Sequence, residues 1–349
     1  MKHNRIRSAV LVAVAVLTAM LFLSSCSKKQ ETLYLYNWTY YTPDSVIKKF
    51  EQEYGVKVVL DNYASNEDMY AKLAAGGSGY DIVFPSQDYT SILITQNMLE
   101  PIDHAKIPNL KYIKPSALKI AEFDPNMAYS VPYYMGAAGI AVNKTKVTDY
   151  ARGWSIFADK RLAGRMSMLD DLREVIGDAL AYLGYSVNTT DLKQLEEAQR
   201  LINEQWKPNI VKFDAEGFAK SFATGEFWVV QGYAEGIFEE LDPARWDEID
   251  FILPQEGGPM YFDSMVIPKG AKNIDLAHKF IDFFLRPEIY AEFLDRFHFP
   301  DTIHSEAGKL MTVTPFYREE DFSNYELKND LGKNLATYDA IWQTIRYVD

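Results

Sequence analysis

The feature that most constrains the fold is an alternation of strand and helix signals early in the chain. Three short β-prone runs, at 33–36, 56–60 and 80–84, are separated by two segments with helical start and stop signals. In the first of these segments Pro43 stands just inside the helix and Gly55 just past its end, as is typical of helix termini. An order of strand, helix, strand, helix, strand indicates an α/β domain with a largely parallel sheet.

A second pattern of the same kind starts near residue 137. Strands are predicted at 140–142, 227–231, 251–254 and 264–268, and helices at 171–183, 190–205 and 275–285. The chain has 349 residues, 48% of them hydrophobic, which is enough for two medium-sized globular units. We therefore expect two α/β lobes of similar size, a chain that crosses between them, and a ligand cleft at their interface.

The N-terminus has the pattern of an export signal. A basic start is followed by an apolar run at 9–23 that is shorter than a membrane span. Cys26, the only cysteine, directly follows Leu23-Ser24-Ser25 and resembles the acylated cysteine of a bacterial lipobox. We expect 1–25 to be a lipoprotein signal peptide and 26–31 a lipid-anchored tether that holds the body on the periplasmic side of a bacterial membrane. The alternative is an ordinary signal peptide that happens to contain a cysteine.

Charge and missing motifs exclude several function classes. The formal net charge of −13 falls to about −16 once the three positive charges of residues 1–25 are removed, which argues against a nucleic-acid partner. A single cysteine excludes an internal disulfide framework and a zinc ribbon. The sequence contains no G-x-S-x-G elbow, phosphate loop or H-E-x-x-H motif, so we expect no cofactor, no metal and no catalysis. A glycosidase-type pair of carboxylates stays open as an alternative.

Aromatic and acidic residues gather where the predicted strands end, which is the edge at which open α/β sheets bind ligands. They follow the first and third strands, open the helix at 171–183, and precede the strand at 264–268: Trp38, Tyr41, Ser86, Asp88, Asp171, Glu174, Tyr261 and Asp263. Each also fits an ordinary structural role. Trp38 suits a half-buried core position, and acids at a helix start favour the helix dipole.

Several segments in this order resemble the periplasmic spermidine/putrescine-binding proteins, the substrate-binding components of polyamine ABC importers. The matching segments are 35–39, 65–73, 80–86, 170–175, 183–190, 254–258, 263–264 and 284–287. The resemblance implies a two-lobed, type II-like periplasmic-binding-protein fold, each lobe a mainly parallel sheet flanked by helices. It places 32–136 and 261–303 in lobe 1 and 137–260 and 304–349 in lobe 2. It also implies a monomer that works with a membrane permease and a separate ATPase.

The resemblance further implies a polyamine in the cleft, with aromatic rings around its methylene groups and carboxylates on its ammonium groups. Carried over position by position, the binding set is Trp38, Tyr41, Ser86, Asp88, Asp171, Glu174, Tyr233, Tyr261 and Asp263. The chemistry agrees, because a buried ammonium needs a carboxylate or a π face. The alternatives are a binding protein of the same fold for another cationic or neutral solute, and a surface glycoside hydrolase.

Three further candidate pocket positions depart from the family pattern. Tyr40 stands where many relatives carry an acid, Phe299 where a tyrosine is frequent, and Lys328 where spermidine binders have a pocket glutamine. A lysine inside a cation pocket repels an ammonium, so an inward Lys328 predicts preference for putrescine over spermidine. Because long lysine side chains readily reach water, we expect Lys328 to point to solvent.

Overall fold

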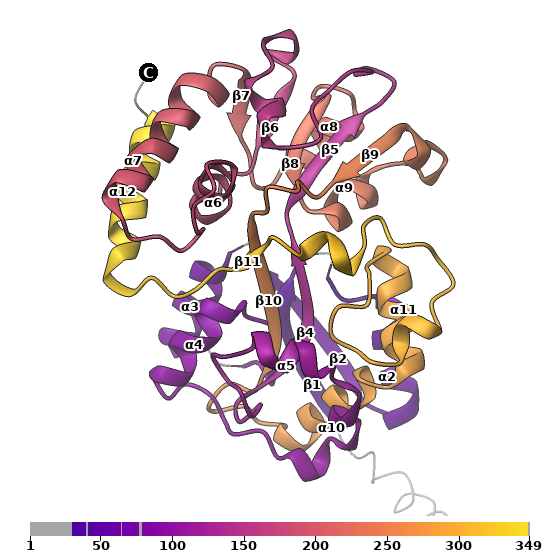
Figure 1. Cartoon of the computed structure of the whole chain (residues 1–349). Coiled ribbons are helices and arrows are strands. Elements are labelled where there is room, and N and C mark those ends of the chain that lie inside the picture. The colour runs from indigo at the N-terminus through magenta and orange to yellow at the C-terminus, as the bar shows by residue number, and fades with distance from the viewer. Residues whose placement is uncertain (1–29, 40, 64, 77–78, 348–349) are drawn as a thin grey trace, which may run out of the picture.

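Two sheets, one in each lobe, organise the chain (Figure 1). The structure is a computed structural model that describes residues 30–39, 41–63, 65–76 and 79–347. The predicted signal peptide, Cys26 and Tyr40 lie outside the described residues. Within the described part of the chain, none of the helices is both long enough and apolar enough to span a membrane.

Lobe 1 contains a sheet in the order β11-β10-β3-β1-β2, with β4 also paired to β10. Its elements are β1 (Thr32–Trp38), α2 (Asp44–Tyr54), β2 (Lys57–Tyr63), α3 (Asn66–Ala74), β3 (Ile82–Val83), α4 (Gln87–Thr95), α5 (Pro115–Ile120), β4 (Ser130–Ala137), β10 (Pro259–Val266), α10 (Ile274–Phe284), α11 (Pro287–Phe297) and β11 (Glu326–Leu327). Helix α2 ends as the sequence predicts, because Gly55 adopts a φ of 66° and its N–H donates to the carbonyl of Glu51.

Lobe 2 contains a sheet in the order β7-β6-β8-β5-β9. Its elements are β5 (Gly139–Asn143), β6 (Met166–Met168), α6 (Leu172–Tyr182), α7 (Leu192–Leu201), β7 (Ile210–Phe213), α8 (Phe218–Ala223), β8 (Val229–Gly232), α9 (Ala234–Glu240), β9 (Ile249–Ile252) and α12 (Leu335–Tyr347). Short 3-10 or π turns lie between elements of both lobes, at 104–106, 108–112, 154–158, 160–162, 202–206, 243–248, 307–309, 319–322 and 332–334. Helix α12, at the end of the described chain, packs against α6 and α7 (Figure 1).

The chain passes between the lobes on long, buried strands. Strand β4 continues into β5 through Ala138, and the return path leads from β9 into β10. Strands β4 and β10 pair antiparallel from Met260 opposite Ala137 to Val266 opposite Ser130, and every residue of both strands is buried. Two adjacent extended segments that run from one lobe to the other are suited to act as a hinge.

Both sheets are mixed. The pairs β1–β2, β1–β3, β6–β7, β6–β8 and β10–β11 are parallel. The pairs formed by β4 or β5, and the pair β10–β3, are antiparallel. Antiparallel pairing is possible here because a strand that arrives from the other lobe needs no helical crossover. The predicted two-lobed α/β class is confirmed, with more antiparallel pairing around the crossing strands than the local β-α-β pattern indicates.

The segment that follows α11 stays with lobe 1 before it reaches lobe 2. His304 forms an isolated bridge with Ile113, and the backbone N–H of Ser305 donates to the carbonyl of Tyr112 at 2.7 Å. The His304 ring lies within hydrogen-bond distance of the carbonyl of Leu285, at 3.0 Å. The chain then reaches β11, which pairs with the start of β10. Residues near 304 are thus in contact with lobe 1 elements, whereas α12 contacts lobe 2 helices.

Candidate functional site

The aromatic residues after β1 are held in place by lobe 1. The Trp38 indole donates from Nε1 to the carbonyl of Phe84 at 2.9 Å, and its ring centroid lies 4.7 Å from that of Tyr63. Tyr41 is buried and packs edge-on against Tyr133 at 5.1 Å. The Trp38 hydrogen bond fixes the ring directly beside the Pro85-Ser86 turn.

Asp263 is a buried carboxylate that has no ion pair among the described residues. Its Oδ1 accepts a hydrogen bond from Ser86 Oγ at 2.7 Å, and the residue is only 3% exposed. A register shift in the β4–β10 pairing falls between Asp263 and Ser264. Burial raises the pKa of Asp263 to about 7, although the hydroxyls of Ser86 and Tyr41 and the charge of Lys328 lower it. A cation placed beside this carboxyl would favour its ionised form.

The start of α6 carries the second group of acids. Asp171 is the N-cap residue, and its Oδ1 accepts from the backbone N–H groups of Arg173 and Glu174 at 2.8 and 3.1 Å. Glu174 is fully buried, and burial raises its pKa, while the charge of Lys328 opposes the increase. Asp171 therefore fills the helix-capping role considered from the sequence, and Glu174 points into the space between the lobes toward Lys328.

Our expectation that Lys328 points to solvent was wrong. Its Nζ lies 2.5 Å from Oε1 of Glu174, and Tyr233 Oη donates to the same oxygen at 3.3 Å. Burial alone would lower the pKa of Lys328, but the carboxylates of Glu174, Asp171 and Asp88 raise it above its ordinary value. The residue is only 8% exposed, and its backbone is held in the sheet. The Lys328 N–H donates to the carbonyl of Met260, in continuation of the β10–β11 pairing.

Tyrosines connect the two groups of acids. The rings of Tyr233, which precedes α9, and Tyr261, on β10, meet edge to face at 5.7 Å. Phe299 lies behind this wall, stacked on Tyr134 at 4.1 Å and edge-on to Tyr41 at 6.3 Å. Phe299 therefore supports the aromatic wall through ring packing, a role that needs no hydroxyl.

Asp88 belongs electrostatically to the group around Lys328. It lies in the first turn of α4, is half-buried, and accepts from the N–H of Tyr89 at 3.0 Å. Burial raises the pKa of Asp88, and the positive charges of Lys328 and Arg173 oppose that increase.

Sequence reasoning missed three polar residues of this region. Burial raises the pKa of Glu235, in the first turn of α9, to about 7, and the charge of Asp263 adds to the increase. Asp178 is buried one helical turn after Glu174 and accepts a hydrogen bond from Gln231. Gln87 accepts from the Phe262 N–H at 2.8 Å and donates to the carbonyl of Lys328. The four-residue spacing from Glu174 to Asp178 on one helix face is the signal that could have found Asp178; the sequence offers none of that kind for Glu235 or Gln87.

The candidate residues thus form two centres on either side of the tyrosine contact. Centre 1 lies on lobe 1 strands and turns and faces α9; it consists of Tyr41, Ser86, Tyr261, Asp263 and Glu235. Centre 2 joins α6 to the segment after β11; it consists of Asp88, Asp171, Glu174, Tyr233 and Lys328. In the part of the chain that the structure describes, no three His, Cys, Asp or Glu residues are grouped to hold a metal ion.

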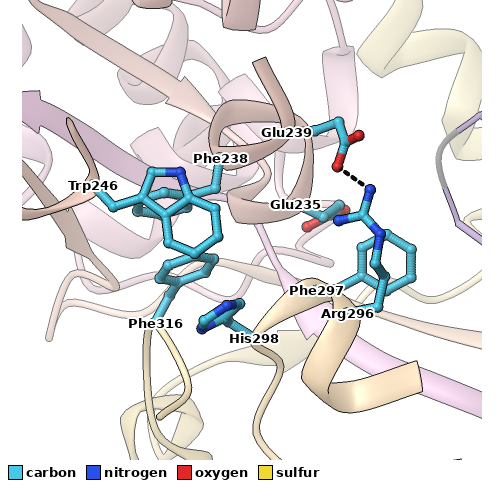
Figure 2. A pocket seen from close by; sticks show the side chains of 8 residues that line it. All are labelled: Glu235, Phe238, Glu239, Trp246, Arg296, Phe297, His298 and Phe316. Atoms are coloured by element: carbon cyan, nitrogen blue, oxygen red, sulfur yellow. Dashed lines mark hydrogen bonds and ion pairs between the residues drawn. The ribbon is translucent and has the colours of Figure 1, made fainter. Parts of the chain in front are cut away.

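A small pocket marks the seam between the lobes next to centre 1, and Glu235 is part of its lining (Figure 2). The Arg296 guanidinium of α11 pairs with Glu239 of α9 at 2.5 Å. Beside this pair, Phe316 stacks on Phe238 of lobe 2 at 3.5 Å and on His298 of lobe 1 at 4.6 Å. The seam is therefore closed by direct contacts between the lobes.

Comparison with known proteins agrees with this architecture. Residues 45–305 match the model of the bacterial extracellular solute-binding protein family. The chain is 35% identical over 323 residues to the spermidine/putrescine-binding periplasmic protein of Escherichia coli, covering 90% of this chain and 91% of that protein. It is 37% identical over 266 residues to the putrescine/cadaverine-binding protein of Pseudomonas aeruginosa, covering 73% and 75%.

Among solved structures, the TpPotD lipoprotein of Treponema pallidum is 57% identical and superposes with a TM-score of 0.88 over 91% of this chain and all of that one. A spermidine/putrescine ABC transporter protein from Listeria monocytogenes is 32% identical, with a TM-score of 0.80 over 92% of this chain and all of that one. On the family match, the identities and the shared two-lobed fold, this chain belongs to the bacterial extracellular solute-binding proteins.

Proposed function

We propose that this protein is the substrate-binding component of an ABC importer for polyamines and that it holds the cation between its two lobes. The curated relatives are named for binding spermidine, putrescine or cadaverine. The observation that carries the proposal is Asp263, a buried carboxylate with no ion pair among the described residues, bordered by the rings of Tyr41 and Tyr261.

Centre 1 has the chemistry that a desolvated alkylammonium group requires. Two carboxyls, Asp263 and Glu235, supply negative charge, and both have pKa values near 7 because burial disfavours their ionised forms. Tyrosine faces attract an ammonium by about 0.5–2 kcal/mol each and also cover the adjacent methylene groups. An ammonium stabilises the ionised forms of both carboxyls, whereas a neutral solute gains nothing from their charge, so the arrangement favours a cationic ligand over a neutral one.

Capture and release follow from the distribution of these residues over two lobes. Tyr261 and Asp263 lie on β10, whereas Tyr233, Glu235 and Glu174 lie on lobe 2 elements. The site is complete only when the lobes approach each other, so ligand binding favours the closed form by its differential affinity. The closed protein then delivers the polyamine to a membrane permease driven by an ATPase. It performs no reaction itself, and no observation favours the glycoside hydrolase alternative.

We further propose that Cys26 carries a lipid and that the binding body works as a monomer on the periplasmic side of the membrane. The lipobox-like sequence before Cys26 supports this, and so does the similarity to a Treponema lipoprotein.

Calorimetric titration of Asp263→Asn with putrescine tests the proposal. The change keeps the side-chain shape and removes the charge partner of an ammonium, so we expect an affinity loss of about 30-fold or more. Asp247→Asn, at an exposed aspartate of lobe 2, is the matched control and should bind like the wild type. Wild-type affinity in Asp263→Asn, or no polyamine binding by the folded wild type, would overturn the proposal.

A further inference from the structure

A resident cation occupies centre 2. The Lys328 ammonium and the Glu174 carboxylate form an ion pair whose side chains are only 10% and 1% exposed. An exposed lysine pair contributes little to specificity, but a pair held out of water places a fixed positive charge at that point. Any ligand that enters the space between the lobes therefore meets carboxyls without a protein cation at centre 1, and at centre 2 an ammonium already placed among the carboxyls.

We infer that Lys328 is a specificity-determining residue, and that its ammonium takes the place beside Glu174 that one amine of a longer polyamine would need. The site then accepts a linear diamine in preference to a triamine. This inference rests on the proposed function and deepens it by naming the ligand class.

Lys328 cannot easily move aside, because the backbone around it is held by both lobes. Gln87 of α4 donates to the carbonyl of Lys328, and Arg173 of α6 donates to the carbonyl of Asn329 at 2.9 Å. Asn188, which like Arg173 belongs to lobe 2, donates to the carbonyl of Leu327, the residue before Lys328, at 2.8 Å. Displacing the lysine backbone would leave several of these buried polar groups without partners, which is costly.

The two centres differ in whether a protein cation already occupies the carboxylate. At centre 2, Oε1 of Glu174 already contacts Lys328 and Tyr233, so a ligand ammonium at this oxygen would lie beside a like charge. At centre 1, Asp263 and Glu235 have no ion pair with any described residue. A ligand ammonium at centre 1 therefore meets carboxyls that no protein cation occupies, whereas a further ammonium that extends to Glu174 would be directed toward Lys328.

The test is calorimetric titration of putrescine and spermidine into the wild type, Lys328→Gln, and Lys333→Gln, an exposed lysine of the same region that serves as control. We expect the wild type to bind putrescine at least about tenfold more tightly than spermidine. Lys328→Gln should shift the affinity ratio toward spermidine by about tenfold or more, because it removes the repulsion and keeps a hydrogen-bonding side chain. Lys333→Gln should leave the ratio unchanged.

The outcomes separate the inference from the proposed function. If the wild type binds both amines equally well, or if Lys328→Gln changes both affinities by the same factor, the inference fails while the proposed function stands. If neither amine binds any folded variant, the proposed function fails and the inference with it. Lys328→Gln leaves Glu174 buried without its partner, so a thermal melt must accompany the titration. If that variant does not fold, the ratio of putrescine to spermidine affinity in the wild type tests the inference: a ratio of about tenfold supports it, and equal affinities contradict it.

Discussion

The raised pKa values of centre 1 predict that polyamine binding depends on pH near neutrality. In the ligand-free protein, burial raises the pKa of both Asp263 and Glu235 to about 7, well above the ordinary range of carboxyl groups. A bound ammonium stabilises the ionised carboxylate, so binding lowers the pKa and releases the proton wherever the group is protonated. The amines of the ligand stay charged over this range and do not titrate with the site.

The magnitude follows from the Asp263 pKa. Above about pH 8 the carboxyl is already ionised, and the affinity should be independent of pH. Below pH 7 each unit of acidification should reduce the affinity about tenfold for one titrating group, so about tenfold is lost at pH 6 and about a hundredfold at pH 5. Glu235 can steepen this decrease, but the two carboxyls interact and their titration belongs to the pair.

The assay is a putrescine titration at pH 5, 6, 7 and 8 in buffers of different ionisation enthalpy, which reports both affinity and the number of protons released. At pH 6 we expect release of about one proton or more, and almost none at pH 8. Asp263→Asn should release fewer protons at pH 6 than the wild type. An affinity that is the same at pH 6 and pH 8, with no proton release, would show that these carboxyls do not face the ligand.

The remaining predictions concern stability, the seam and the anchor. Because the folded Asp263 binds a proton up to about pH 7 and an unfolded aspartate only to about pH 4, ligand-free stability should decrease as pH rises through this window. The melting temperatures of the wild type and of Asp263→Asn at pH 5 and pH 8 measure this difference. The same change of melting temperature with pH in both proteins would contradict it. Arg296→Ala removes a half-exposed ion pair across the seam and should weaken putrescine binding by less than about fivefold. The effect should become smaller at high salt. An affinity loss above a hundredfold would instead make the ion pair part of the binding site. Cys26→Ser should abolish labelling with a fatty acid and leave putrescine affinity unchanged, and label retained by this variant would refute the anchor.

Local sequence patterns were sufficient for the general layout and for the ends of α2, α6 and α10 to within one residue, but they predicted none of α4, α11 and α12. Gly55 ends α2 through a left-handed turn, and Ser65 caps α3 by accepting from the Asp68 N–H at 3.2 Å. Residues after strand ends, such as Trp38 and Ser86, also come close together, as the common edge of parallel strands requires. The helix ends depend on neighbours within a few residues, which a single sequence contains, whereas the meeting of strand ends follows from the β-α-β order.

Features that depend on distant partners were not predictable in the same way. Gln87 matters because it joins Phe262 and Lys328, which lie 175 and 241 residues further along the chain. The mixed pairing of the sheets likewise depends on β4 and β10 meeting across the lobes. Glu235 has the pattern of an ordinary first-turn acid of a helix, and only the tertiary structure brings its charge within reach of Asp263, where partial burial raises its pKa.

Lys328 shows most directly why a side-chain rule failed. A lysine reaches water when its backbone leaves the four-carbon chain a path to the surface, which is the common case. Here β11 attaches the preceding residue to β10, Gln87 holds the Lys328 carbonyl, and the side chain is directed toward Glu174. Burial of this charge is tolerable because the Glu174 carboxylate lies within contact distance, and removing either partner would leave the other uncompensated. The ion pair is therefore a consequence of how the last crossing of the chain is attached to both lobes. The same attachment places a positive charge where a third ligand amine would otherwise bind.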